Sequence, residues 1–257
     1  STRELRASAA GFASGVGRWS PRHYAPAVFI VAGTGRCGTR ALCDALDRFT
    51  DHAVRHEPEP RLLAEAWRAH QGRWRWTPTY LRRLAGFRRA DGTAVGESIR
   101  CAPLLTDIAR VAPKCRVVVP FREPTAYLHS AWGRGVMRRG DEWDRLRILP
   151  PEAHGRAPVD QVLFHYAEIN RILAETAEHL GPRAMVVEIG DLDRVADAIA
   201  AFVGATVSDR AALSAFLATR PNAGPVDGWD AEALPAPSVD ALEMARSVYE
   251  RLRTAAG

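Results

Sequence analysis

The sequence predicts one domain with a three-layer α/β fold, in which helices flank both faces of a central parallel sheet. Short apolar runs alternate with longer segments of helical period, which is typical of parallel strands joined by crossover helices. The 257 residues are 47% hydrophobic and 25% charged, enough to bury one substantial core. The sequence shows no internal repeat, so residues 1–257 are assigned to a single domain, of which 1–26 form an N-terminal extension.

The first strand is expected at residues 28–31, an apolar run that ends in glycines. Apolar residues then recur at helical spacing through 41–49 and predict the first helix. The segment 51–55 makes a poor strand, whereas 93–95 is a weak candidate for one. Between them, residues 62–70 have a helical pattern.

The middle of the chain contains a clear strand and an irregular segment. Residues 80–89 have a helical pattern, and 103–111 leads into a strand at 116–119 that is followed by another helix. The stretch 133–158 is rich in Gly, Arg and Pro and has no clear period. Because long irregular segments in compact domains usually serve as lids or linkers, we expect a mobile loop over the site there.

The last part of the chain continues the alternation of strand and helix. The longest helical pattern runs through 159–180 and ends at Gly181-Pro182. A strand is expected at 184–187, followed by another helix. An amphipathic helix is expected at 239–252.

The formal net charge is +5, a balance that fits either a nucleic acid or an anionic small substrate. Of the 35 basic residues only Lys114 is a lysine, and the other 34, all arginines, are scattered along the whole chain. This even distribution argues against a nucleic-acid partner. Guanidinium groups nevertheless suit phosphate and sulfate, because they bind two oxygens at once.

Apolar runs and cysteine spacing exclude several classes of protein. No run approaches the roughly 20 residues of a membrane span, and residues 1–26 lack the apolar stretch of a signal peptide, which predicts a cytoplasmic protein without a membrane partner. The cysteines form no C-x-x-C pair, so neither a zinc site nor a disulfide framework is expected. The predicted free thiols are Cys37, Cys43, Cys101 and Cys115.

Residues 33–40, Gly-Thr-Gly-Arg-Cys-Gly-Thr-Arg, join the first strand to the first helix, where backbone N–H groups favour an anion. The glycine spacing fits the dinucleotide-binding fingerprint with Glu57 as its acidic residue, but that interpretation needs a strand where 51–55 is poor. It also fits a Walker loop, yet Thr39 stands where a phosphate-gripping lysine is needed. Nor is the strand 116–119 followed by a magnesium-holding aspartate.

The same loop resembles the 5′-phosphosulfate loop of sulfotransferases that use 3′-phosphoadenosine 5′-phosphosulfate (PAPS), in which a Lys or Arg precedes a small residue, Gly and Ser/Thr. The matching residues are Arg36, Cys37, Gly38 and Thr39. That family also has an arginine at a strand end and a serine eight residues later, a spacing shared by Arg122 and Ser130. The resemblance covers 28–57 and 116–132 well and 185–202 loosely, and it implies a bacterial, P-loop-like sulfotransferase fold.

The resemblance implies roles for the residues of the first loop. Arg36 would contact the 5′-phosphate and the bridging oxygen and so stabilise the leaving group. Thr39 and the backbone N–H groups from Gly35 to Arg40 would complete the cradle, with the Cys37 thiol as a spacer. The Arg40 side chain would point either to phosphate or to solvent.

Two further segments are implied to bind the nucleotide. Arg122 would grip the 3′-phosphate as a guanidinium fork, and Ser130 would donate its hydroxyl to it. Arg220 and Asn222 lie in a segment, 220–224, that resembles the loop closing on the nucleotide in some sulfotransferases, although Pro, Asn and Gly also make a plain turn. No metal is expected.

The general base is expected to be a carboxylate or a histidine. Glu57 lies 21 residues after Arg36, at a position that resembles the catalytic glutamate of tyrosylprotein and related Golgi or bacterial sulfotransferases. A histidine is the base in the cytosolic aryl and steroid branch, so His56 is the alternative. Glu59 and Glu97 are further candidates.

Together these features predict an enzyme that transfers the sulfuryl group of PAPS to a hydroxyl acceptor, a small molecule, glycan or secondary metabolite, and releases the bisphosphate PAP. The segment 67–89 mixes Trp67, Trp74 and Trp76 with seven arginines, and either contacts the acceptor or covers the site as an amphipathic pair of helices. The acceptor and the oligomeric state do not follow from the sequence. The alternatives are a P-loop nucleotide kinase or NTPase, and a non-catalytic arginine-rich anion-binding protein.

Overall fold

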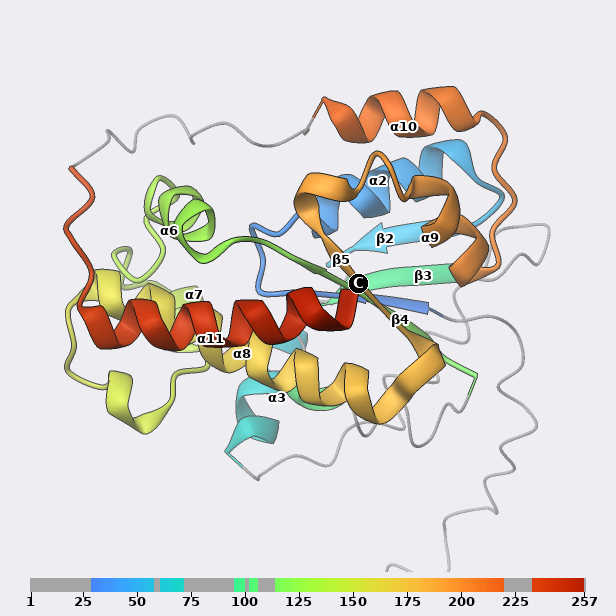
Figure 1. The fold of residues 1–257 in the computed structure, drawn as a ribbon. Coiled ribbons are helices and arrows are strands. Elements are labelled where there is room, and N and C mark those ends of the chain that lie inside the picture. The colour runs from blue at the N-terminus through green and yellow to red at the C-terminus, as the bar shows by residue number, and fades with distance from the viewer. Residues whose placement is uncertain are drawn as a thin grey trace, which may run out of the picture.

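The computed structural model describes residues 29–57, 61–71, 95–99, 102–105, 114–219 and 233–256 (Figure 1). Within these residues the sheet has five strands, all parallel, in the order β2-β3-β1-β4-β5. The strands are β1 (Phe29–Ala32), β2 (Ala53–His56), β3 (Val95–Ile99), β4 (Arg116–Phe121) and β5 (Ala184–Glu188). The predicted α/β class with a central parallel sheet is confirmed.

Helices cover both faces of this sheet. They are α2 (Thr39–Phe49), α3 (Arg61–His70), α6 (Pro124–Trp132), α7 (Glu142–Arg145), α8 (Pro158–Leu180), α9 (Ala196–Val203), α10 (Arg210–Ala218) and α11 (Val239–Ala256). Short 3-10 helices lie at Ala102–Leu104, Pro151–Ala153, Gly181–Arg183 and Ile189–Asp191. Helices α2, α9 and α10 pack on one face, and α3, α8 and α11 pack on the other, which gives the three predicted layers (Figure 1).

Strand β1 is buried on both faces, which explains its unbroken apolar sequence. Phe29 and Val31 pack with α2 and α9, while Ile30 and Ala32 pack on the opposite face with α8. This alternation follows from the two-residue period of a strand. A further apolar cluster joins α6, the first half of α8 and the start of α11.

Four of the five strands begin in segments where the sequence predicts them. The predicted strands 28–31, 93–95, 116–119 and 184–187 correspond to β1, β3, β4 and β5. The judgement that 51–55 makes a poor strand is wrong, because β2 occupies Ala53–His56. β2 lies at the edge of the sheet, where Val54 is buried and Arg55 is exposed. It therefore lacks the apolar run by which a buried strand is predicted from sequence.

The predicted helices 41–49, 62–70, 159–180 and 239–252 correspond to α2, α3, α8 and α11. The predicted helix 80–89, most of 103–111 and the extension 1–26 lie outside the described residues. The irregular segment 133–158 consists of turns, α7 and a 3-10 helix, and it buries Val136, Ile148 and Ala153. Its mobility stays a prediction.

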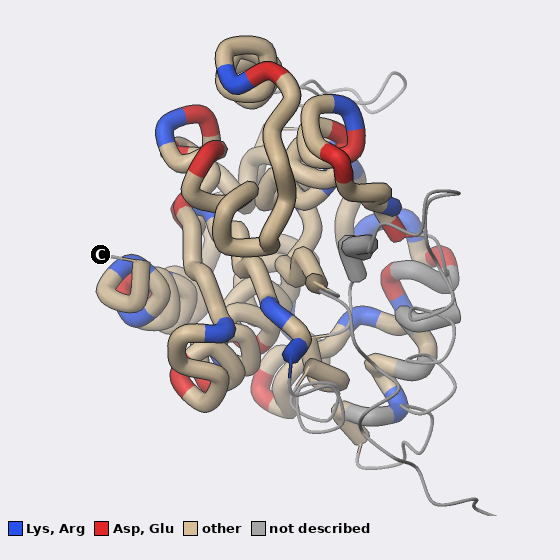
Figure 2. The backbone as a smooth tube through the Cα atoms, turned by 90° about the vertical axis from the view of Figure 1, so that its right-hand side faces the viewer, with Lys and Arg blue, Asp and Glu red and all other residues tan. Residues whose placement is uncertain are grey.

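Charged residues of both signs lie side by side on the outer helices (Figure 2). Several form ion pairs that join different elements, such as Arg251 with Glu178 and Arg156 with Asp240. Positive charge is therefore balanced locally over much of the described surface. Among the described helices, none is long and apolar enough to cross a bilayer.

Candidate anion-binding site

The site lies where the chain leaves neighbouring strands in opposite directions. β1 and β4 pair directly, from Phe29 opposite Arg116 to Val31 opposite Val118. After β1 the chain passes through α2 to β2 on one side of the sheet, and after β4 it passes through α6 and α8 to β5 on the other (Figure 1). Ligands of open α/β sheets bind at such a switch point, beyond the carboxyl ends of the strands.

The first corner is the loop between β1 and α2, whose tight path depends on three glycines. A Cβ on Gly33 would lie 2.3 Å from the Cys37 sulfur and 3.2 Å from the carbonyl oxygen of Pro120 on β4, so only glycine fits without a shift. Gly35 and Gly38 have φ of 76° and 83°. Arg36 also has positive φ, 57°, which costs a non-glycine residue on the order of 1 kcal/mol. Strain of this kind is common at functional sites.

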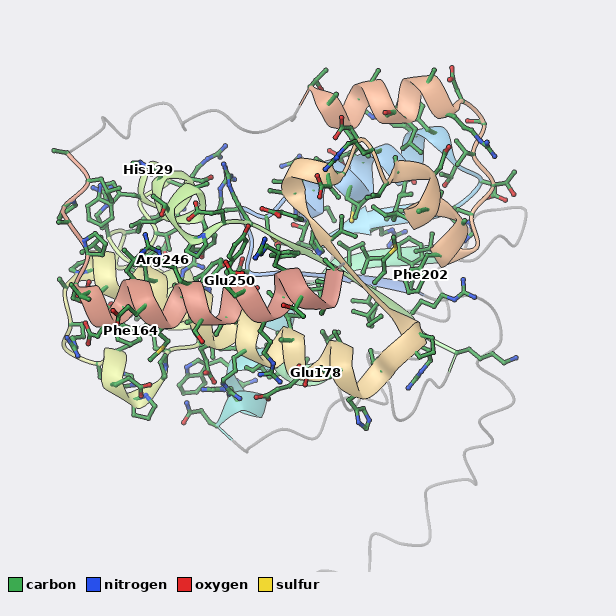
Figure 3. All side chains as sticks on the ribbon, viewed as in Figure 1. His129, Phe164, Glu178, Phe202, Arg246 and Glu250 are labelled. Atoms are coloured by element: carbon green, nitrogen blue, oxygen red, sulfur yellow. The ribbon has the colours of Figure 1, made fainter. Side chains whose placement is uncertain are left out.

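The two helices that begin at the site differ in how their N-termini are capped. Glu123 caps α6, because its carboxylate accepts the N–H groups of Thr125 and Ala126 at 2.9 and 2.6 Å. Partial burial raises the pKa of Glu123, but these N–H donors, with Arg246 on α11 (Figure 3), bring it below its ordinary value. The cap of α2 is Gly38, which has no side chain to satisfy the first N–H groups. The end of α2 thus suits an external anion.

The second corner, between β4 and α6, meets the first directly. The Nε of Arg36 donates to the Oγ of Ser130 at 3.1 Å, and Nη1 of Arg122 donates to the Arg36 carbonyl oxygen at 3.3 Å. Tyr166 on α8 fixes the backbone beneath, since its hydroxyl donates to the Arg122 carbonyl oxygen at 2.6 Å. The predicted residues of both motifs therefore come together.

A third arginine joins this cluster. Burial, followed by the positive charges of Arg134 and Arg122, lowers the pKa of Arg36 to about 10. The Arg36 guanidinium is still a cation at neutral pH. The sequence interpretation missed both Arg134 and Tyr166. The sequence does contain a pattern that could have indicated Arg134, because this residue follows Ser130 by four positions, about one helical turn.

The other residues of the first loop have distinct surroundings. Cys37 is fully buried, and desolvation raises the pKa of its thiol, so it remains protonated and fills space beside Gly33, as a spacer does. Thr39 is buried in the first turn of α2. The Arg40 side chain is 65% exposed and lies 3.8 Å from Asp44, so of its two expected orientations the structure has the solvent one.

The candidate bases lie at the same edge of the sheet. His56 ends β2 at the level of Ser98, and Glu57 follows with a φ of 46°, a second positive value at a predicted site residue. Glu97 lies further from this edge, two residues before the end of β3 and opposite Ile30. The remaining predicted residues Glu59, Arg220 and Asn222 lie outside the described residues, as does most of 67–89.

The strand order tests the dinucleotide-binding interpretation of the loop between β1 and α2. In the dinucleotide-binding fold the second strand lies beside the first. Here β3 lies between β1 and β2, which puts Glu57 two strand spacings, about 10 Å, from β1. The dinucleotide interpretation is therefore excluded by topology, although β2 and its following carboxylate exist.

Among the comparisons with known proteins, only that with solved structures found a match. No protein-family model and no curated protein matches the sequence. The structure is similar to a sulfotransferase from Alicyclobacillus acidocaldarius, with a TM-score of 0.52 and 16% identity over 90% of this chain and 96% of that one. It also aligns with the sulfotransferase domain of the olefin synthase of Synechococcus PCC 7002, with a TM-score of 0.49 and 17% identity over 91% and 98% of the two chains. The chain has a sulfotransferase fold.

Proposed function

We propose that the protein transfers the sulfuryl group of PAPS to a hydroxyl acceptor, a small molecule or a glycan. The observation that supports this proposal best is the 3.1 Å contact of Arg36 with Ser130, which joins residues 94 positions apart in the sequence. It brings the loop expected to bind the 5′-phosphosulfate against the helix expected to bind the 3′-phosphate. One adenosine bisphosphate thus has a donor set for each of its two phosphate positions.

The proposed reaction is an in-line displacement at sulfur. A base removes the acceptor proton, the acceptor oxygen forms a bond to sulfur, and the bond from sulfur to the bridging oxygen breaks to release PAP. Arg36, fixed in the loop before the reaction, offsets the negative charge that gathers on the leaving phosphate. Arg122, Ser130 and Arg134 neutralise and hold the 3′-phosphate, so the Arg36–Ser130 contact gives way when the nucleotide binds.

Calorimetry with four ligands tests the donor. PAP is expected to bind about 100-fold more tightly than AMP, which lacks the 3′-phosphate, a difference of about 2.7 kcal/mol. ATP with magnesium tests the alternative of a kinase or NTPase. RNA tests the alternative of a protein that binds anionic polymers through its arginines. Equal affinity for PAP and AMP, or preference for either control ligand, contradicts the proposal.

Glu57 is the proposed base, and its replacement separates chemistry from binding. Glu57→Gln keeps the size of the side chain but cannot accept the acceptor proton, so turnover is expected to fall at least about 100-fold while PAP affinity changes less than about 2-fold. His56→Asn is the matched variant at the neighbouring position. Full activity of Glu57→Gln with loss in His56→Asn assigns the base to the histidine instead.

A further inference from the structure

We propose that Asp144 is a positioning residue for the nucleotide site, because its carboxylate holds the turn that keeps Arg134 in the arginine cluster. The proposal rests on the proposed function, since the purpose of the cluster is to bind the phosphates of PAP. Asp144 lies on α7, within the segment 133–158, and ten residues after Arg134.

The turn wraps around the Asp144 carboxylate. The N–H of Met137 donates to one of its oxygens at 3.0 Å, and those of Arg139 and Gly140 donate to the other at 2.8 and 3.2 Å. Three left-handed residues shape the turn, with φ of 66°, 65° and 65° at Gly135, Met137 and Gly140. Such successive N–H groups form a concave anion site, here filled by the chain's own carboxylate.

The backbone conformation of Met137 needs support from the Asp144 carboxylate. It is a non-glycine residue with a φ of 65°, a conformation that costs free energy unless the surroundings fix it. Its N–H is one of the three bound by Asp144. Loss of the carboxylate therefore lets Met137 relax and the turn open.

The turn is connected to Arg134 on both sides of that residue. The Arg134 N–H donates to the Ala131 carbonyl oxygen at the end of α6, at 3.1 Å. On its other side, the Arg139 side chain donates to the Arg134 carbonyl oxygen. The backbone N–H of Arg139 is itself bound by Asp144, so the carboxylate and Arg134 are two hydrogen bonds apart.

The turn is also tied to α8. Arg147 Nε lies 3.6 Å from the Asp144 carboxylate, and its Nη1 lies 3.3 Å from Nε2 of His165. Nδ1 of His165 contacts the Ile148 carbonyl oxygen at 2.9 Å and so must donate there, which leaves Nε2 to accept from Arg147. Through these contacts the buried face of α8 is a fixed base for the turn.

The cluster needs such an anchor because its charges repel. The positive charges of Arg134 and Arg122 already lower the pKa of Arg36, after the larger effect of burial. This repulsion disfavours the close approach of the three guanidinium groups, and the turn bound by Asp144 opposes an outward movement of Arg134. The anchor thus keeps the site ready for the nucleotide.

A double-mutant cycle on PAP affinity tests the proposal. Asp144→Asn is expected to weaken PAP about 10-fold, and Arg134→Met about as much. In the Arg134→Met background Asp144→Asn is expected to have almost no further effect, because the residue through which it acts is gone. The control is Asp209→Asn, which makes the same substitution at the start of α10, where the carboxylate accepts the Ala212 N–H at 2.9 Å, and is expected to leave PAP affinity unchanged.

A rescue variant separates positioning from general loss of structure. Met137→Gly adopts the left-handed conformation without steric strain, so in the Asp144→Asn background it is expected to restore PAP affinity to within about 3-fold. Additive losses in the cycle, or no rescue by Met137→Gly, overturn the role of Asp144 while leaving the proposed function intact. A wild-type protein that does not bind PAP overturns both.

Discussion

Burial fixes the protonation state of three side chains around the two corners. It raises the pKa of the Cys37 thiol and of the Tyr166 hydroxyl, so both keep their protons. Burial, together with the charges of Arg134 and Arg122, lowers the pKa of Arg36 to about 10. A cation with a lowered pKa destabilises the folded state, and this destabilisation is present at neutral pH and is relieved only as pH rises through about 10. A bound phosphate offsets it instead by supplying the opposite charge.

Ser130 contributes a single hydroxyl, and its loss is expected to depend on the ligand. Ser130→Ala removes the donor proposed for the 3′-phosphate, so PAP affinity should fall about 10-fold and AMP affinity by less than about 2-fold. Ser238→Ala, remote in sequence and at the start of α11, is the control. Calorimetry with both ligands measures the difference, and equal losses for PAP and AMP reject the assignment of Ser130.

At this scale the sequence predicts residues of local motifs and misses those that depend on tertiary contacts. Arg36, Arg122 and Ser130 follow from spacing within two short segments, and the structure brings them together. Tyr166 acts on Arg122 from α8, 44 residues away, and no spacing rule links a helical tyrosine to a strand end.

Strands with two buried faces are the elements that can be predicted from sequence. β1, β4 and β5 have apolar runs because helices cover both of their faces. β2 has a partly exposed pattern and depends on its neighbours, including the N–H of Val54, which donates to the Asp47 carboxylate at 2.9 Å. Its existence therefore follows from the assembled sheet and not from its own four residues.

The loop from β1 to α2 is the element most sensitive to added volume. Gly33→Ala places a methyl group 2.3 Å from the Cys37 sulfur and 3.1 Å from the Thr39 methyl carbon, and both of these side chains are buried. We expect a lower midpoint of thermal unfolding, by about 5 °C or more, and at least a 10-fold loss of PAP affinity.

Two further variants complete that test. Gly190→Ala is the control, because a Cβ there meets nothing within 4 Å, and it should behave like the parent. Cys37→Ala in the Gly33→Ala background removes the closest clash and should restore part of both losses. A Gly33→Ala protein as stable as the parent contradicts the close packing of this loop.

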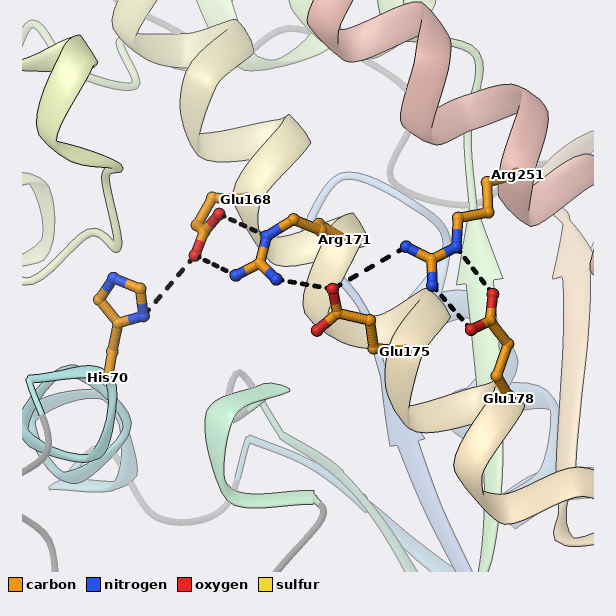
Figure 4. Close-up of polar contacts among 6 residues, drawn as sticks. All are labelled: His70, Glu168, Arg171, Glu175, Glu178 and Arg251. Carbon is orange, nitrogen blue, oxygen red and sulfur yellow. Dashed lines mark hydrogen bonds and ion pairs between the residues drawn. The ribbon is translucent and has the colours of Figure 1, made fainter.

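On the scale of the whole molecule, a chain of charged side chains ties three helices together on one face of the sheet (Figure 4). Its buried end is Glu168 on α8, which accepts from Arg171 at 3.0 and 2.8 Å and lies 3.8 Å from His70 on α3. Its exposed end is the pair of Arg251 on α11 with Glu178 on α8, joined by two contacts of 2.7 Å. Arg171 donates to Glu175 at 2.7 Å, and Glu175 lies 3.9 Å from Arg251, so these contacts connect the two ends.

The two ends of this network are expected to differ in their effect on stability. Glu168→Gln leaves the Arg171 guanidinium without its buried partner, so the free energy of unfolding should fall by about 2 kcal/mol. Glu178→Gln, at the exposed end, should cost clearly less, because solvent screens that pair. Urea denaturation of both variants measures the difference, and equal losses would show that burial does not govern this network.

The arrangement of the strands is the property of the whole molecule that the sequence does not provide. Alternating strands and helices predict a parallel sheet, but they do not say that β3 inserts between β1 and β2. That insertion excludes the dinucleotide interpretation, which the spacing of Glu57 alone leaves open. Order within a sheet is decided by contacts between segments far apart in the chain, which no local pattern reports.

The hydrogen bonds that join Arg36 to Ser130 and Arg122 also have a consequence for folding. These contacts close chain separations of 94 and 86 residues, and they depend on the pairing of β1 with β4. Contacts of such long range form slowly, and a partly folded chain has neither corner in place. The proposed nucleotide affinity therefore requires the complete sheet, and a bound nucleotide would stabilise the contact between the two corners against unfolding.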